Sequence, residues 1–397
     1  MAILFAGLFG ACSRSSGPLD PSSRVIEEAA QKGPTGSEVI SAQIITDGGR
    51  ATDAHELLDA LSRALGEERF QDAQEQGQLL LRVEDQLSAE ERLDAYLGLG
   101  IAQDRGGAPQ DALETFLHWQ KSQSRAPAEA TRRYRVQKEE LQLRLVRLLL
   151  FFERYESAGE TAALVSLELR RPLELVTLYS AKGLALVQTN DLGPAMRYFA
   201  RGRRVVEENG YHQLSVPPID LAPLYFGRGE VARLQSKAIS LQPDVHFLAD
   251  LERRCELLLR AQGEYSQVMR IGNAHWSAMS GVRVGELYSD LHRELMKITP
   301  SGSHSTDRQE LFRAAMRLRY SILLKKAVTM MKSTVAMIAR TGEKTPWRQR
   351  ALDALTQLED AQIAEEAALS RLPFSRDELQ EILDDMARGA EQPKEQS

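Results

Sequence analysis

Two stretches of the chain, YLGLGIAQDRGGAPQDALETF at residues 96–116 and YSAKGLALVQTNDLGPAMRYF at residues 179–199, share one spacing of residue types. In each, a glycine follows a tyrosine by four positions, an alanine follows twelve positions later, and a phenylalanine comes four positions after that. Small residues at this spacing allow two antiparallel helices to cross closely, while the aromatic rings fill the space between neighbouring helix pairs. The residues concerned are Tyr96, Gly100, Ala112 and Phe116 in the first copy, and Tyr179, Gly183, Ala195 and Phe199 in the second.

This spacing resembles the tetratricopeptide repeat, W-x2-L-G-x2-Y-x8-A-x3-F, with tyrosine in the tryptophan position and Leu99 matching as well. Weaker copies surround Ala73, Ala158 and Val268. The units span 37 to 46 residues between successive alanines and are longer than an ordinary repeat of this family, so they are tetratricopeptide-like. The resemblance implies an α-solenoid of helix pairs whose concave face binds other proteins.

Composition agrees with an all-α fold. Of the 397 residues 43% are hydrophobic and only 6% aromatic, and Leu, Ala, Glu, Gln and Arg, which are good helix formers, are abundant. The formal net charge of −6 offers no general attraction to the phosphates of nucleic acid, so we expect no nucleic-acid partner. The sequence contains no run of about 18 apolar residues, so it predicts no membrane-spanning helix.

Gly, Pro and Ser, which interrupt helices, and helix-capping residues mark the boundaries between segments of the chain. The prediction is an α-solenoid of helix pairs followed by a C-terminal helical bundle or cap. Its parts are a signal peptide over residues 1–11, a lipidated tether over 12–52, repeats over 53–209, an irregular Pro/Gly-containing insertion over 210–247, a further repeat over 248–281, long helices over 282–388 and a polar tail over 389–397.

The first residues, MAILFAGLFGAC, form a short apolar run that ends in two small residues and a cysteine. Phe9, Gly10, Ala11 and Cys12 resemble the lipobox of bacterial lipoproteins, although no basic residue precedes the run and phenylalanine stands where leucine is usual. The resemblance implies that Cys12 becomes the mature N-terminus and carries diacylglycerol and acyl chains, which anchor the protein stably. Ser13 after Cys12 resembles the signal for the outer membrane.

A partner groove is predicted from the helix faces that point away from the tyrosines and glycines. Leu97, Ile101 and Asp104 share one stripe, and Ser180, Leu184 and Val187 form the equivalent stripe in the second copy. Apolar side chains here suit an amphipathic helix or an extended apolar peptide. The alternative is that the insertion or the C-terminal helices fill this groove, which would make the same residues part of the core.

A basic stretch runs through residues 311–340, which contain no acid. It can dock acidic headgroups, lipopolysaccharide phosphates or an acidic partner, or its cations can pair with acidic neighbours such as LEDAQIAEEAALS at residues 358–370. Its basic residues are Arg313, Arg317, Arg319, Lys325, Lys326, Lys332 and Arg340.

Sequence motifs for catalysis are weak throughout. The seven histidines lie far apart, G-x-G-x-x-A at residues 227–232 lacks a preceding strand, and Cys255 sits on an apolar helix face. We therefore expect no catalytic residues, metal, cofactor or small-molecule substrate. The leading hypothesis is a non-enzymatic scaffold, lipid-anchored on the periplasmic face of the bacterial outer membrane, that serves envelope proteins of secretion, pilus or gliding motility, or polysaccharide export. A cytosolic scaffold with a misread N-terminus and an enzyme of unrecognised type are the alternatives.

Overall fold

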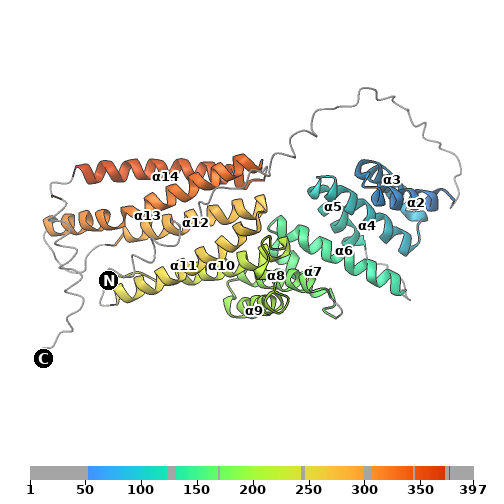
Figure 1. Cartoon of the computed structure of the whole chain (residues 1–397), viewed down its shortest axis with the longest axis horizontal. Helices are drawn as coiled ribbons and strands as arrows, with labels where there is room; N and C mark the ends of the chain where they lie inside the picture. The colour runs from blue at the N-terminus through green and yellow to red at the C-terminus, as the bar shows by residue number, and fades with distance from the viewer. Residues whose placement is uncertain are drawn as a thin grey trace, which may run out of the picture. The chain divides into compact units, whose positions relative to one another are not determined.

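The computed structural model describes residues 52–122, 131–168, 170–242, 246–298, 306–342 and 345–371, together with Ser375. These ranges contain thirteen α-helices and no β-strand, so the fold is all-α (Figure 1). The helices are α2 (Thr52–Gly66), α3 (Phe70–Arg82), α4 (Ala89–Arg105), α5 (Pro109–Ser122), α6 (Arg132–Phe151), α7 (Tyr155–Ala163), α8 (Pro172–Gln188), α9 (Leu192–Glu208), α10 (Ala222–Lys237), α11 (Phe247–Ile271), α12 (Ala274–Leu295), α13 (Thr306–Thr341) and α14 (Trp347–Ser370).

The described residues form two compact units, which divide between Gly98 and Leu99 inside α4. In the first unit α2 packs on α3, and the side chain of Leu61 lies against Gly98, where a Cβ would come within 3.0 Å of its Cγ atom. Tyr96 is buried there and donates a hydrogen bond of 2.7 Å to Glu84 Oε2. Burial and this carboxylate together raise the pKa of the Tyr96 hydroxyl well above its usual value.

Four helix pairs are joined by the same tight turn. The residue two positions before the second helix has a positive φ in each case, at Glu68, Gly107, Glu153 and Asn190. Each of these residues precedes by five positions one of the buried alanines Ala73, Ala112, Ala158 and Ala195. The repeat register predicted from these alanines is therefore confirmed, and the turn itself is a structural part of the repeat.

Within the second unit, the repeat residues pack as their sizes predict. A Cβ at Gly100 would lie 2.8 Å from Phe116 Cδ1, and one at Gly183 would lie 2.9 Å from Phe199 Cδ1, so both aromatic rings occupy the space that glycine leaves. Ala112, Phe116, Ala195 and Phe199 are at most 1% exposed, whereas Tyr179 is only half-buried. The absence of a side chain at each glycine is what lets the two helices of a pair approach.

The segment over residues 210–247 is not an irregular insertion, because α10 occupies its centre and packs on α8, α9 and α11. Gly229 of α10 faces Tyr265 of α11, where a Cβ would lie 2.7 Å from Cε1, and Ala261 is fully buried four positions before that tyrosine. Thus α10 and α11 form a further pair with the same crossing. Pro217 and Pro218 lie ahead of α10, and Pro223 lies within its first turn, where a missing N–H is tolerated.

The long C-terminal helices continue this arrangement. Gly285 of α12 faces Met331 of α13, four positions after the buried Ala327, so the same crossing recurs with methionine in place of an aromatic ring. The predicted boundary between residues 281 and 282 falls inside α12. Successive first helices of the pairs contact one another, α6 with α8, α8 with α10, α10 with α12 and α12 with α14, which produces one solenoid layer.

The last helix is attached at its first residue. Trp347 is 1% exposed and donates a hydrogen bond of 2.8 Å from Nε1 to Oε1 of Glu153, in the turn between α6 and α7. The guanidinium groups of Arg283 and Arg350 lie 5.5 and 4.5 Å from the centre of its indole ring. This buried indole with its polar partners fixes the start of α14 to the turn that Glu153 occupies.

Several predictions concern residues outside the described ranges: the signal peptide, Cys12 and its lipids, most of the tether, and the tail over residues 389–397. Within the ranges that are described, no helix combines the length and the apolar character that crossing a bilayer demands.

Candidate functional site

A groove of about 700 Å³ opens in the second unit, beside the C-terminal half of α6. Its walls come from the turn between α4 and α5, from α6 and α8, from the chain that enters α10, and from the first turn of α12. We call it the apolar groove. It is lined by Asp104, Gly107, Pro109, Arg144, Arg147, Leu148, Leu150, Phe151, Thr177, Ile219, Asp220, Pro223 and Trp276.

Three of the four charged side chains of the apolar groove form ion pairs within the protein. Arg147 donates from Nε and Nη2 to Asp220 Oδ1, at 3.2 and 3.0 Å, and Thr177 Oγ1 donates to the same oxygen at 3.1 Å. Arg144 Nε donates to Glu140 Oε1 at 2.8 Å. Because two arginines and two aspartates line the groove, its lining carries no net charge. A neutral groove with apolar walls suits an apolar segment of a partner better than a charged ligand.

One exposed aliphatic side chain lines this groove, and two others lie within five residues of it in the same loop. Leu214, Val216 and Ile219 lie between α9 and α10 and are 45, 75 and 52% exposed, and Ile219 itself lines the groove. Large apolar side chains that a folded chain leaves in solvent at one place are typical of surfaces that bind other proteins. The groove and this loop together therefore form the candidate partner site.

The residues predicted to line a partner groove lie in two different environments, one at the apolar groove or half-buried and the other in the core. Asp104 is exposed and lines the apolar groove, while Leu97 and Ile101 are half-buried. Leu184 and Val187 are only 1% and 8% exposed, since α10 packs over α8 and places Gly227 next to Leu184. These two residues therefore belong to the core, which corrects the prediction that they line an open groove and agrees with its alternative.

Partial removal of water by the surrounding protein raises the pKa of the Asp104 carboxyl, and the nearby guanidinium groups of Arg144, Arg105 and Arg147 act in the opposite direction. The stronger signal in the sequence was the run LRLVRLLLFF, where Arg144 and Arg147 interrupt an apolar helix three residues apart. Asp220, the acid that holds Arg147, lies 73 positions further on and could not be paired with it from sequence.

The basic stretch lies along α13, and three of its cations pair with α14. Arg317 Nε lies 3.9 Å from Glu365, Lys325 Nζ 3.8 Å from Glu366, and Lys332 Nζ 2.9 Å from Glu359. Arg319 and Lys326 lie over the rings of Tyr320 and Tyr288, whereas Arg313 is exposed. The three acids belong to residues 358–370, so this pairing matches the alternative in which the basic stretch meets its acidic neighbour.

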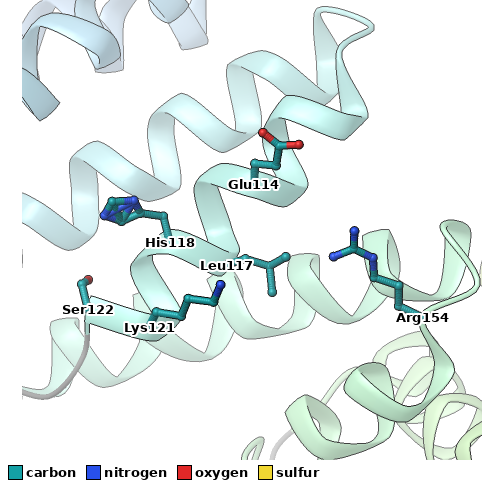
Figure 2. Close-up of a pocket in the computed structure, with 6 residues that line it drawn as sticks. All are labelled: Glu114, Leu117, His118, Lys121, Ser122 and Arg154. Atoms are coloured by element: carbon teal, nitrogen blue, oxygen red, sulfur yellow. The ribbon is translucent and has the colours of Figure 1, made fainter.

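A shallower hollow of about 550 Å³ lies on α5. Figure 2 shows that Arg154, in the turn before α7, reaches toward Leu117, while the other lining residues project from α5: Glu114, His118, Lys121 and Ser122. Its lining has one carboxylate, one hydroxyl and one aliphatic side chain, and its other residues are basic. It therefore offers less apolar contact to a peptide than the apolar groove does.

Buried ionisable groups gather where α10, α11 and α12 meet. Glu230 lies 2.6 Å from Arg233 Nη2 and 3.3 Å from Arg283 Nε, and Tyr265 donates to it at 2.5 Å. Burial alone would raise the pKa of Glu230, but the two arginines and the tyrosine outweigh it and hold this pKa below its usual value. Since each group has its partners within the network, it accounts for helix packing without a reaction.

Within the described part of the chain, no three His, Cys, Asp or Glu side chains are close enough together to hold a metal ion. Cys255 is buried, and burial raises the pKa of its thiol to about 11, so the reactive thiolate is scarce near neutral pH.

No protein-family model matches the chain, and no curated protein matches it. Among solved structures, a circular tandem repeat protein with novel repeat topology and enhanced subunit contact surfaces shares 19% sequence identity, over 85% of this chain and 77% of that one, with a TM-score of 0.25. The helical-repeat architecture therefore rests on the packing of the helices within this chain.

Proposed function

We propose that this protein is a non-catalytic scaffold that binds an apolar or amphipathic segment of a partner protein in the apolar groove. It works in this proposal without a metal, a cofactor or a small-molecule substrate, and without nucleic acid. The observation that carries the proposal is the groove itself, a neutral cleft of about 700 Å³ that is lined by Phe151 and Trp276 and by the exposed side chain of Ile219.

Chemical reasons favour a peptide as the occupant. Aromatic and aliphatic walls supply the burial that drives association, while Thr177, Arg147 and Asp220 hold one another and present few unpaired charges to an incoming segment. A solenoid also positions such a groove rigidly, which lowers the entropy lost when the partner binds.

Site-specific photo-crosslinking tests this proposal. A photoreactive amino acid at Ile219, 52% exposed at the groove, should crosslink to a partner in the producing cells, whereas the same group at Val136, 60% exposed on α6 and absent from the groove lining, should not. Ile219→Asp should abolish co-purification of that partner and Val136→Asp should preserve it. Equal crosslinking at both positions, or co-purification that survives Ile219→Asp, would contradict the proposal.

We propose further that Cys12 carries the lipid anchor, that the protein faces the periplasm from the outer membrane, and that its partner belongs to an envelope machine for secretion, pilus or gliding motility, or polysaccharide export. The support is the lipobox-like sequence that ends at Cys12. Cys12→Ser should abolish incorporation of labelled fatty acid and release the protein from the membrane fraction. Retention of Cys12→Ser in that fraction would refute the anchor and leave the partner groove to be judged by its own test.

A further inference from the structure

A third hollow, of about 890 Å³, lies between α10, α12 and α14, and Leu324 and Met331 of α13 also line it. The helix α14 turns small side chains toward it, including Ala354, Ala361 and Ala364, which leave space between α14 and α12 unfilled. We call this hollow the basic cavity. Its lining residues on α12 extend from Arg283 to Lys297, beyond the end of that helix, a distance of about 21 Å at helical rise.

Three buried polar atoms of residues that line the basic cavity accept or donate no hydrogen bond within the described residues. They are Nε of Arg283, Nε2 of His292, whose residue is 8% exposed, and Oε1 of Glu365 on α14. The ion-pair partner of Glu365, Arg317, keeps its Nε atom 3.9 Å from that oxygen. Unpartnered polar atoms in a buried position are costly, so they mark a place where a further polar group fits.

The lining of the basic cavity is positive in a chain that is negative overall. Five cations face three acids, Glu286, Asp290 and Glu365, which gives a net charge of +2. Lys237 and Arg293 share the single carboxylate of Asp290. The cations are Arg233, Lys237, Arg283, Arg293 and Lys297.

We infer that the basic cavity is the docking site of the chain's own C-terminal segment, residues 376–388. This segment, RDELQEILDDMAR, lies outside the described residues, and its sequence predicts an amphipathic helix capped by Ser375 and Glu378. Its apolar residues Leu379, Ile382, Leu383 and Met386 fall on one helical face. With five acids and two arginines the segment carries a charge of −3, which complements the cavity.

The lengths also agree. Glu365 lines the cavity and stands five residues, about 8 Å, before the end of α14. The four residues 372–375 can span up to about 14 Å, so residue 376 can reach the end of the cavity near Lys297. A helix over residues 376–388 is about 20 Å long and matches the cavity's extent along α12. Docked antiparallel to α14 in this cavity, it covers the alanines.

This inference is independent of the partner groove, which lies on other residues. It is tested by hydrogen exchange on the full chain, followed by mass spectrometry of peptides that cover residues 376–388 and the α14 face. Docking predicts that amides of 376–388 exchange at least tenfold more slowly than in Leu379→Asp/Leu383→Asp, which removes the apolar face, and that peptides over 354–365 lose protection in the same variant.

A second pair of variants separates docking from a helix that forms without contact. Arg293→Glu/Lys297→Glu should accelerate exchange in residues 376–388, since both cations line the cavity and are exposed. The matched control Arg203→Glu/Arg204→Glu reverses two exposed cations on α9 and should leave this exchange unchanged. Exchange in 376–388 at the unprotected rate, insensitivity to the cavity variant, or protection that vanishes on tenfold dilution and so comes from a second copy would each overturn the inference.

Discussion

Substitution of Gly183 by alanine probes the helix crossing that defines the repeat. A Cβ at this position would lie 2.7 Å from Cζ and 2.9 Å from Cδ1 of Phe199, and closer still to Cε1, so the ring must move by nearly 1 Å to restore ordinary van der Waals contact. A second helix also restricts the ring. Gly227 of α10 approaches it so closely that a Cβ there would lie 2.6 Å from Cε1, and the same Cβ would lie 3.2 Å from Cδ2 of Leu184.

The expected cost is about 1–3 kcal/mol of overpacking, against which alanine gains up to about 1 kcal/mol of helix propensity over glycine. Gly263→Ala is the matched control, because Gly263 lies inside α11 and a Cβ there meets nothing within 4 Å. The methyl group added in Gly263→Ala raises helix propensity and contacts no aromatic ring. The difference between the two variants thus isolates the overpacking of Phe199.

Hydrogen exchange of amides in α8 and α9 measures this difference locally, which suits a repeat protein whose segments open separately. Relative to the unmodified protein, the change in protection of the α8 and α9 amides in Gly183→Ala should be less favourable than the change in protection of the α11 amides in Gly263→Ala. The two changes should differ by roughly 5- to 150-fold, the factor that corresponds to 1–3 kcal/mol. Phe199→Leu should weaken the effect, since the smaller side chain leaves room for the added methyl group. Equal changes in protection, in α8 and α9 of Gly183→Ala and in α11 of Gly263→Ala, would refute the close crossing of Gly183 with Phe199.

Three further outcomes are expected. Glu68→Gly should stabilise the α2–α3 pair by about 1 kcal/mol in urea unfolding, because glycine adopts the positive φ of this exposed turn without strain, whereas Glu67→Gly should not. Trp347→Ala should cost α14 about 3–5 kcal/mol of local stability by hydrogen exchange, and protection unchanged in α14 would contradict its anchoring at Glu153. Burial, with Arg317 nearby, lowers the pKa of His292 in the folded protein. Because the unfolded chain then binds the proton more tightly, the free energy of unfolding should fall as pH drops below about 6.5. The variant His292→Gln should therefore lose less melting temperature than the unmodified protein between pH 7.5 and 5.5.

Local spacing was enough to predict the helical repeats. Ala73, Ala112, Ala158 and Ala195 mark the repeat in the sequence because a close crossing tolerates only a small residue there, and all four are fully buried. The pair formed by α10 and α11 was missed for a related reason. Its Gly229 and Ala261 stand 32 positions apart where the first copies have 12, and the prolines ahead of α10 suggested a loop.

The candidate site could not be assembled in the same way. Asp104 was identified from its helical stripe, but the groove that contains it depends on Asp220, Ile219 and Trp276, which come from distant parts of the chain. Leu184 has the same spacing as Ile101, but α10 packs over α8 and leaves Leu184 1% exposed, whereas Ile101 is half-buried. Periodicity specifies the face of a helix on which a residue lies, while the next helix along decides whether that face meets solvent.

The growing distance between glycine and alanine along the solenoid has an evolutionary consequence. The second helix begins three residues before its alanine in α5 and α9, 14 residues before Ala261 in α11, and 21 residues before Ala327 in α13. The crossing therefore stays constant while the arms of the hairpin beyond it lengthen. Insertions and deletions of whole helical turns at the hairpin tips can accumulate there without altering the packing at the glycine. Related proteins can thus differ in the length of these helices, and so in the width of the scaffold, while the crossing at the glycine and alanine is kept.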